Sequence, residues 1–504
     1  MLIKNDKSLR RYAATVERAL GTWETAPEEW ADYIAFLSRL LRAIQSHGKD
    51  ASALPHSSDV ASKLAQCLNP ALPSGVHQKA LEVYTYIFAT FGREYVTDHL
   101  HAFLPGLSGV LSFASLSTRP GLYDLLENYI VRLDPVDLRP IMKSLVLSVL
   151  PALEDETSED FEQALSILAK LESSFVRHDT DEPSEDAGYF WQCLFLAVIT
   201  SPSRRQGALN YLTRRLPSFA ILTASQKENG EGITDLSHAA EAALTPESGL
   251  LIRCFVCGLA DPQPLIQRGF LDLLVTHLPL SSPVLQERVM KPDFDKLTTA
   301  TISVLLRRDM SLNRRVWSWL LGPEAKDAGN VSPSVERNEA LHSEESQQFR
   351  HFATFGQASV QRCLMAMLEH PGLRPVEKAR PFRICLSLMD RWEIGGVLVP
   401  RLFLPAMKSV HAYSTQATRE EATEAIKSAS LFFDGTESRL IWSELFKLLQ
   451  NEPEKSSESL DDLHFFRWIV QNFNVREEEM LTLHIPLVTG YLLDWLARDR
   501  KSVV

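Results

Sequence analysis

The sequence predicts an all-α fold, a HEAT- or armadillo-like helical-repeat solenoid with irregular repeats. Two observations indicate helices. Apolar residues recur at steps of three and four along most of the 504 residues, and no convincing period-two strand pattern competes with them. A third observation, a short phrase that recurs at HEAT-like intervals, indicates repeats. Because each short helix pair has an apolar face that it cannot bury alone, stacked pairs would form the core.

The first helix that the periodicity predicts follows Thr25-Ala26-Pro27-Glu28, which has the pattern of a capping box with proline in the first turn. The apolar residues expected on its buried face are Trp30, Tyr33, Ile34, Leu37, Leu40, Leu41 and Ile44. We expect this helix to end near His47-Gly48, and a second helix to follow Pro73-Ser74-Gly75 and to end before Gly92. The same spacing predicts helices over 121–133, 138–150, 158–176, 188–200, 249–259, 264–277, 296–308, 312–321, 354–369, 380–391, 418–433, 438–450, 459–473 and 479–497.

A similar phrase follows three of the tight turns between these helices. It reads Gln206-Gly-Ala-Leu-Asn-Tyr-Leu, Arg268-Gly-Phe-Leu-Asp-Leu-Leu and Arg315-Val-Trp-Ser-Trp-Leu-Leu. The interval between the second and third copies lies within the roughly 40–47 residues of a HEAT repeat. In that repeat an acidic turn residue precedes a basic helix residue, and Asp261 with Arg268 and Asp309 with Arg315 fit this arrangement.

Polar segments interrupt the helical pattern over 48–58, 178–187, 224–248 and 323–348. The last segment has almost no large apolar residues, so we expect a mobile surface loop there. The predicted organisation is therefore a helical-repeat region over 1–322, the mobile polar loop over 323–348, and continuing helical repeats over 349–504.

Composition narrows the environment and the class of partner. The formal net charge of −12 argues against broad nucleic-acid binding, which needs a basic face. Six cysteines without regular spacing do not form a disulfide framework, which favours a reducing compartment. The first residues carry no apolar signal-peptide core. The longest stretch without a formal charge, 99–118, contains Pro105, Gly106 and Gly109 and is expected to form two half-buried segments around a turn, so membrane association would be peripheral.

No catalytic or nucleotide-binding motif stands out. The sequence has no P-loop, Rossmann fingerprint, H-E-x-x-H or G-x-S-x-G. We therefore predict a protein that is not an enzyme and that uses no cofactor and no metal. The single C-x-x-C, from Cys254 to Cys257, favours two small core residues over a zinc or redox site, because no second ligand pair accompanies it.

Two other motifs have a functional and a structural interpretation. His99-Leu-His101 supplies at most half of a metal site, so a core or surface role is favoured. Trp317-Ser-Trp319 has the residues of an aromatic ligand platform, but its helical spacing favours core packing.

Arginine dyads are the strongest candidates for a binding surface. They are Arg204-Arg205, Arg214-Arg215, Arg307-Arg308 and Arg314-Arg315. Equivalent helix positions in successive repeats line one surface, so these arginines would form a basic stripe suited to acidic peptides or anionic lipid head groups. The alternative is that they form ion pairs within and between repeats.

The turn from Asn69 to Lys79 is a second candidate surface. Pro70 and Pro73 shape the turn, and His77 and Lys79 begin the next helix. The turn would either cap one helix and start another, or present His77 and Lys79 to a protein partner.

The segment Ser62-Lys-Leu-Ala-Gln-Cys-Leu-Asn-Pro-Ala-Leu-Pro-Ser-Gly-Val-His-Gln-Lys-Ala-Leu-Glu-Val-Tyr84 resembles the N-terminal region of the Dopey family. Further phrases fit the same family in the expected order: Trp30-Ala-Asp-Tyr-Ile-Ala-Phe-Leu-Ser38, Leu138-Arg-Pro140, Leu150-Pro-Ala-Leu-Glu-Asp-Glu156, Phe190-Trp-Gln-Cys193 and Leu212-Thr-Arg-Arg-Leu-Pro217. The resemblance is strong over about residues 8–217 and weaker to about 321.

This resemblance implies a trafficking adaptor in endosome-to-Golgi transport, on the cytosolic face of trans-Golgi and endosome membranes. The implied partners are a large scaffold similar to Arf exchange factors, a P4-type phospholipid flippase and, for some members, conventional kinesin. Proteins of this family are much longer than this chain, and the family has no known catalytic residues. The alternative function is a peripheral membrane module that binds anionic lipid through the arginine dyads.

Overall fold

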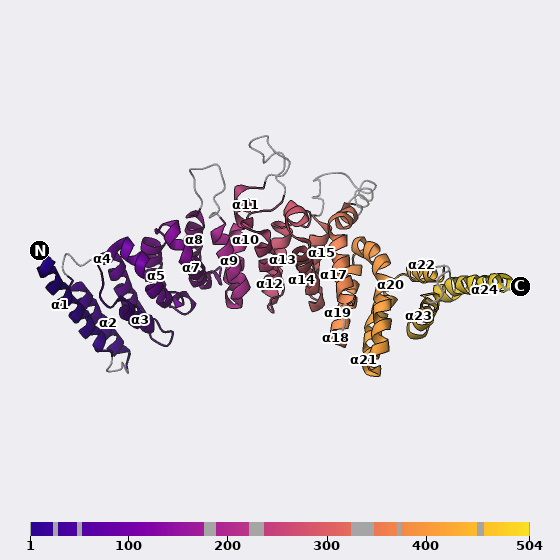
Figure 1. Cartoon of the computed structure of the whole chain (residues 1–504), viewed down its shortest axis with the longest axis horizontal. Helices are drawn as coiled ribbons and strands as arrows, with labels where there is room; N and C mark the ends of the chain where they lie inside the picture. Colours follow the sequence, from indigo (N-terminus) through magenta and orange to yellow (C-terminus); the bar gives the residue numbers. More distant parts are fainter. Residues whose placement is uncertain are drawn as a thin grey trace, which may run out of the picture. The chain divides into compact units, whose positions relative to one another are not determined.

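The fold was examined in a computed structural model that describes residues 2–23, 29–47, 53–175, 188–220, 236–323, 347–369, 374–450 and 458–502 (Figure 1). Within these ranges the regular secondary structure is helical and no strand is assigned. The prediction of an all-α helical-repeat solenoid is therefore confirmed. The predicted cap at Thr25 to Glu28 lies outside the described residues, as does most of the predicted mobile loop over 323–348.

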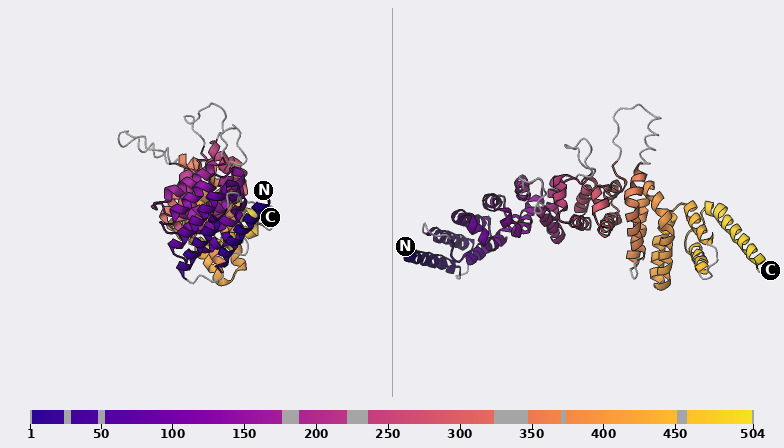
Figure 2. Two further views of the ribbon diagram at one scale, coloured as in Figure 1. Left: turned by 90° about the vertical axis from the view of Figure 1, so that its left-hand side faces the viewer. Right: turned by 45° about the horizontal axis from the view of Figure 1, so that its top comes forward.

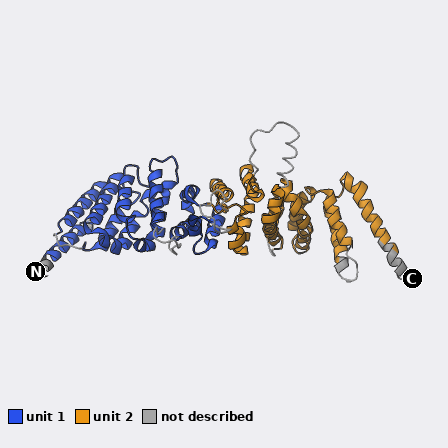
Figure 3. Ribbon diagram, turned by 90° about the horizontal axis from the view of Figure 1, so that it is seen from above, with its two compact units in different colours: residues 1–217, 236–258 blue, residues 218–235, 259–504 orange. Residues whose placement is uncertain are grey.

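Internal contacts divide the chain into two compact units, which Figure 3 shows in different colours. Unit 1 comprises residues 1–217 and 236–258, and unit 2 comprises residues 218–235 and 259–504.

Unit 1 is a series of short helices, of which α4 is the longest. The α-helices are α1 (Leu2–Gly21), α2 (Trp30–Gln45), α3 (Ser57–Cys67), α4 (Ser74–Leu107), α5 (Arg119–Leu125), α6 (Pro135–Leu138), α7 (Met142–Val149), α8 (Phe161–Ser173), α9 (Tyr189–Thr200), α10 (Arg205–Arg215), α11 (His238–Leu244) and α12 (Ser248–Leu259), whose last residue belongs to unit 2. Short 3-10 and π turns join them: η1 (Val110–Ser112), η2 (Leu126–Ile130), η3 (Arg139–Ile141), η4 (Leu150–Leu153) and η5 (Pro202–Arg204).

Neighbouring helices of unit 1 pack in chain order, as a solenoid requires. α1 packs on α2, α3 packs along α4, and α7 contacts α8 and α9. Gly92 adopts φ 78°, which a glycine reaches without steric cost, so it ends the first straight part of α4 at the predicted position. At Gly207 of α10, an added Cβ would collide with the Leu150 backbone of η4. The glycine of the repeated phrase therefore permits a close helix approach.

One detail of unit 1 differs from the expectations. Trp30 is 60% exposed and is not part of the buried face of α2, whereas Leu37, Leu40, Leu41 and Ile44 are buried as predicted. The segment 99–118 turns at Ser108 and Gly109, between the end of α4 at Leu107 and η1, and α4 continues through Pro105.

Unit 2 begins its described helices with α13 and extends to α24. Its α-helices are α13 (Pro264–Thr276), α14 (Lys291–Ser303), α15 (Met310–Leu321), α17 (Gln357–Glu369), α18 (Pro375–Lys378), α19 (Arg380–Met389), α20 (Trp392–Gln416), α21 (Arg419–Asp434), α22 (Ser438–Gln450), α23 (Glu458–Asn472) and α24 (Ile485–Ser502). The 3-10 and π segments are η7 (Val284–Arg288), η8 (Val304–Arg307), η9 (Phe352–Gly356) and η10 (Met480–His484).

Helices of unit 2 pack both on the next helix in the chain and on helices slightly further along it. α13 packs on α15, α14 on α17, and α17 on α20. α20 and α21 lie side by side, which is visible in the orange part of Figure 2. The periodicity did not predict α20, which contains two prolines, Pro400 and Pro405.

Motifs with an uncertain role are placed in or near the core. Cys254 is fully buried, and burial raises its thiol pKa well above the usual value. Trp319 is buried and its Nε1 donates to the Leu278 carbonyl at 3.0 Å, while Trp317 Nε1 donates to the Ser387 carbonyl at 3.1 Å. The His99 ring stacks on Tyr95 with centroids 4.1 Å apart. These contacts agree with the structural interpretation of each motif.

Within the described ranges, no single helix is both long and apolar enough to cross a membrane. α11 and α12, which meet at an angle of 78°, meet the length and composition criteria only as a bent pair.

Candidate binding surfaces

The first arginine dyad of unit 1 lies at the start of α10. Arg204 Nη2 donates to Ser112 Oγ at 2.7 Å, and its Nη1 lies 3.6 Å from the Glu154 carboxylate. Arg205 Nε donates to the Val198 carbonyl at the end of α9, at 2.9 Å. Both side chains are half-buried. This dyad therefore connects α10 to preceding elements of the same unit.

The second dyad of unit 1 ends α10 and faces acidic residues of α8 and the turn before it. Arg214 lies within 3.5 Å of Glu156 and 3.8 Å of Glu162. Its guanidinium also stacks over the Phe161 ring at 4.7 Å. Arg215 lies 3.4 Å from Glu172, which also accepts a hydrogen bond from Tyr211 at 2.8 Å.

Charge and burial compete at Arg215. Burial alone would lower the pKa of the Arg215 guanidinium, but Glu172 and Tyr211 together outweigh burial and raise that pKa. Exposed ion pairs of this kind are each worth only about 0–1 kcal/mol, so the pairs of unit 1 orient α10 more than they stabilise it.

The dyads of unit 2 are less uniform. Arg307 Nη2 donates to the Pro262 carbonyl at 2.8 Å and to the Asp261 carbonyl at 3.2 Å. Arg308 is exposed and adopts φ 56°. Arg315 Nε donates to Asp272 Oδ1 on α13 at 2.6 Å.

Asp309 and Arg315, which fit the acidic and basic positions of the HEAT pattern, have different partners in the structure. Asp309 Oδ1 accepts hydrogen bonds from the backbone N–H groups of Ser311 and Leu312, so Asp309 is the N-cap of α15. The carboxylate that Arg315 contacts comes from the preceding helix pair.

Within the described ranges, four of the eight dyad members, Arg204, Arg214, Arg215 and Arg315, form the ion pairs of the structural alternative. Arg205 and Arg307 donate to backbone carbonyls. The basic stripe stays a prediction.

The Asn69–Lys79 turn packs into unit 1 through its histidine. His77 is only 4% exposed, its Nε2 lies 2.8 Å from the Asn69 carbonyl, and its ring contacts Phe113 edge-on. Lys79 is partly exposed and pairs with Glu82 one turn later at 2.6 Å. The burial of His77 favours a structural role for that residue, and a partner-binding role for Lys79 stays a prediction.

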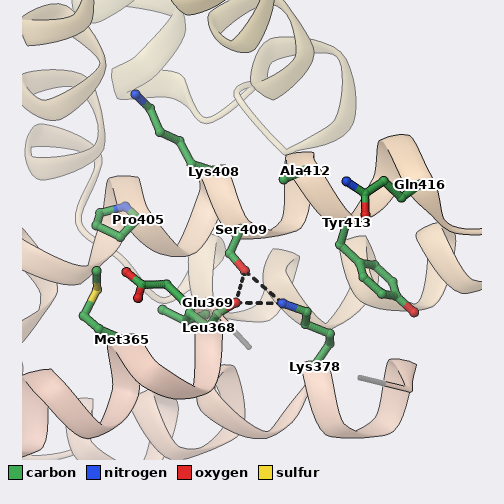
Figure 4. A pocket seen from close by; sticks show the side chains of 10 residues that line it. All are labelled: Met365, Leu368, Glu369, Lys378, Pro405, Lys408, Ser409, Ala412, Tyr413 and Gln416. Carbon is green, nitrogen blue, oxygen red and sulfur yellow. Dashed lines mark hydrogen bonds between the residues drawn. The ribbon is translucent and has the colours of Figure 1, made fainter. Parts of the chain in front are cut away.

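A groove of about 430 Å³ opens between α17, α18 and α20 of unit 2 (Figure 4). Its lining residues are Met365, Leu368, Glu369, Lys378, Pro405, Lys408, Ser409, Ala412, Tyr413 and Gln416. Lys378 is 7% exposed, and its Nζ donates to the Leu368 carbonyl at 2.7 Å and to Ser409 Oγ at 3.3 Å. Burial lowers the pKa of Lys378.

These contacts make Lys378 a link between three helices. The Leu368 carbonyl belongs to the last turn of α17, where a cation compensates the negative end of the helix dipole. The Nζ also lies 5.8 Å from the Tyr413 ring centroid. Lys408, which Figure 4 shows extending away from Lys378, pairs with Asp462 at 3.2 Å. Lys378 therefore has internal partners in the groove.

A second cavity, of about 370 Å³, lies beside the C-terminal part of α15. It is lined by Arg314, Trp317, Ser318, Leu321, Gly322, Gln348 and Arg391. Sequence reasoning singled out Arg314 and Trp317 but missed Arg391, Gln348 and Lys378. No spacing rule links these residues, because the chain between them forms separate helices that only packing brings together.

The helical-repeat architecture, with basic side chains at its cavities, places the chain in a class of proteins that is typical of non-enzymatic scaffolds. Two family models match it. The model described as Dopey, N-terminal, covers residues 6–325, and the model of the DOP1 middle TPR domain covers residues 351–503. The chain belongs to the Dopey family, as the resemblance predicted.

Relatives with the family's name cover nearly the whole chain. Protein dop1 of Emericella nidulans is 47% identical over 97% of this chain and 27% of its own length. Protein DOP1 of Saccharomyces cerevisiae is 34% identical over 98% of this chain and 29% of its own length. Protein DOP1B of Mus musculus is 31% identical over 99% of this chain and 22% of its own length. The chain thus spans between a fifth and a third of the length of these curated relatives.

Proposed function

We propose that this chain is a non-catalytic scaffold or adaptor in vesicle and protein transport between endosomes and the Golgi, and that it binds protein partners through its helical repeats. The observation that carries the proposal is the family match over residues 6–325 and 351–503 of a helical-repeat fold. Stacked helix pairs present long rows of side chains to a partner, which suits a scaffold.

The proposed partners are a large scaffold protein similar to Arf exchange factors, a P4-type phospholipid flippase and conventional kinesin. The proposed location is the cytosolic face of trans-Golgi and endosome membranes. A test is affinity capture of the tagged chain from cells after mild crosslinking, together with fractionation of membranes. Recovery of the first two partners in Golgi and endosome fractions is expected. A chain that captures neither partner and is absent from these membranes would contradict the proposal.

A second candidate function is a peripheral membrane module that binds anionic lipid through the arginine dyads. Its support is that the Arg308 side chain is exposed and forms no ion pair or hydrogen bond with any residue that the structure describes. Flotation with phosphatidylserine vesicles separates the two functions. Salt-sensitive flotation that is lost when Arg204, Arg205, Arg214 and Arg215 are reversed to glutamate would favour the lipid function. Flotation that is absent or unchanged would favour the adaptor.

A further inference from the structure

The cavity beside α15 combines two guanidinium groups from distant parts of unit 2. Arg314 lies on α15, and Arg391 is the N-cap residue of α20. The volume of about 370 Å³ falls within the range of roughly 300–1,000 Å³ that ligand pockets in proteins occupy. Leu321 and Trp317 supply apolar walls, while Ser318 and Gln348 supply polar groups.

The two arginines differ in how their charge is compensated. Arg391 donates to both carboxylate oxygens of Glu393, at 2.8 and 3.2 Å, and to Gln348 Oε1 at 3.1 Å. Glu393 is only 3% exposed, so this pair is fixed in place. The Arg314 side chain is exposed and forms no ion pair or hydrogen bond with any residue that the structure describes. The cavity therefore has one positive charge that no described carboxylate neutralises.

An exposed aromatic pair continues from the same lining residues. Phe349 follows Gln348 in the chain, and Trp392 follows Arg391. Their rings stack with centroids 6.1 Å apart and an interplanar angle of 18°. Trp392 is 53% exposed and Phe349 is 36% exposed. Tryptophan and arginine are the residue types that most often dominate binding energy at protein interfaces.

We propose that this cavity, with the Phe349–Trp392 pair at its side, binds an acidic peptide segment of a protein partner. A carboxylate of the segment pairs with Arg314, whose planar guanidinium donates hydrogen bonds to both carboxylate oxygens at once. An adjacent apolar side chain of the segment packs on the stacked rings. This inference deepens the adaptor function by naming a site and a partner chemistry, but peptide binding itself does not depend on a role in transport.

The number of basic residues favours a peptide over a membrane surface as the ligand of this cavity. Recruitment to an anionic membrane generally uses clusters of roughly four to eight basic residues. The cavity has two arginines, and Glu393 neutralises one of them. A single guanidinium is enough to bind a carboxylate of a peptide, because hydrogen bonds between two charged groups are directed and are stronger than those between neutral groups.

The test measures fluorescence anisotropy of a labelled peptide in which glutamates flank a central phenylalanine, titrated with the full chain. Arg314→Glu is expected to weaken binding about tenfold or more, which corresponds to about 1.4 kcal/mol. Trp392→Ala is expected to weaken binding about threefold to tenfold. Arg308→Glu is the matched control, since Arg308 is also an exposed arginine of unit 2 without a described partner but does not line the cavity.

Each outcome supports or overturns the site. The site is supported if Arg314→Glu abolishes peptide binding and Arg308→Glu does not. It also requires that a peptide with glutamines in place of the glutamates does not bind. Equal loss with both arginine variants would show nonspecific electrostatics and overturn it, as would no binding to the unmodified chain. Binding of phosphatidylserine vesicles that only Arg314→Glu abolishes, without peptide binding, would assign the site to a membrane surface instead.

Melting curves of both variants keep the test independent of folding, and Arg314→Gln replaces Arg314→Glu if the latter unfolds. The result also stays separate from the transport proposal. If the chain binds the peptide but captures no Golgi or endosome partner, the peptide site is supported and the adaptor function is contradicted. If it captures these partners but does not bind the peptide, the adaptor function is supported and the site is contradicted.

Discussion

The arginine dyads at the C-terminal end of α10 in unit 1 and in the middle of α15 in unit 2 share the same sequence and differ in environment. Arg214 and Arg215 both contact carboxylates of their own unit. Of the pair in unit 2, Arg315 contacts Asp272, whereas Arg314 lines a cavity. A dyad is therefore not a functional signal in itself. The role of each arginine depends on whether a carboxylate of the neighbouring helix pair lies within ion-pair distance of its guanidinium.

The physical reason lies in the helix period. Adjacent residues on an α-helix point about 100° apart, so one member of a dyad faces the previous repeat while the other faces elsewhere. In unit 1 an acidic turn and α8 supply partners in both directions, from Glu156 to Glu172. Among the residues that the structure describes in unit 2, Asp272 of α13 is the one carboxylate that pairs with the dyad on α15.

The largest expected effect concerns an arginine of unit 1 that is more deeply paired than the dyads. Arg119 Nη1 donates to Asp160 at 2.9 Å, and Tyr123 and Ser158 donate to the same carboxylate. We expect Asp160→Asn to lower the free energy of unfolding by about 3 kcal/mol, because it leaves the Arg119 guanidinium partly buried without its counter-charge. Urea unfolding followed by circular dichroism measures this loss. Glu159→Gln, at the exposed neighbouring position, is the control and should have little effect.

The lowered pKa of the Asp160 carboxyl also makes the stability of the folded chain depend on pH in acid. Burial alone would raise the pKa of Asp160, but hydrogen bonds from Ser158, Tyr123 and Arg119 outweigh burial and hold that pKa below its usual value. The ionised form is thus favoured in the folded chain. Its stabilisation is present above about pH 3.8, the value of the unfolded chain, and is lost as the pH falls through the lower folded pKa.

Unfolding midpoints in urea at successive pH values check this dependence. The difference between the unmodified chain and Asp160→Asn should be constant near neutral pH and should shrink in acid. A difference that does not change with pH would contradict the assignment of the stabilising charge to Asp160.

The second effect is at His77 in unit 1. We expect His77→Ala to lower the free energy of unfolding by about 2 kcal/mol, because it empties the space of a buried ring and removes its contacts with the Asn69 carbonyl and with Phe113. Differential scanning calorimetry measures the change. Reduced capture of a partner without a fall in melting temperature would instead support a direct binding role for His77.

The third effect compares the two members of the unit 2 dyad. Arg315→Ala should lower the free energy of unfolding by about 1 kcal/mol, since it removes the contact with Asp272. Arg314→Ala should leave stability unchanged and act only on ligand binding. Chemical unfolding of the two variants in parallel checks the comparison, and a loss at Arg314 as large as that at Arg315 would show that the two positions do not differ.

The smallest effect is expected at Lys79. Its contact with Glu82 is an exposed pair within one helix, so Lys79→Ala should change the free energy of unfolding by less than about 0.5 kcal/mol. Affinity capture with this variant then tests partner binding without interference from folding. Unchanged capture would remove Lys79 from the candidate binding residues.

Much of the fold was predictable because helix periodicity survives in sequence. The segments expected over 188–200, 264–277 and 438–450 correspond closely to α9, α13 and α22. Helix α20 was not predictable in the same way, because each proline inside a helix costs about 3 kcal/mol locally. The buried face of α20, with Leu398, Leu402, Phe403 and Met407, offsets that cost at about 1.5–3 kcal/mol per large apolar side chain.

The sequence by itself determined the helical class, the order of most helices and the family, because apolar spacing and long distinctive phrases are local properties of the chain. Only the tertiary structure decided which arginine is paired and which lines a cavity. It also decided that His77 lies in the core and that Arg391 joins Arg314 at one cavity. These outcomes depend on which side chains packing brings together from distant helices, and no local pattern records them.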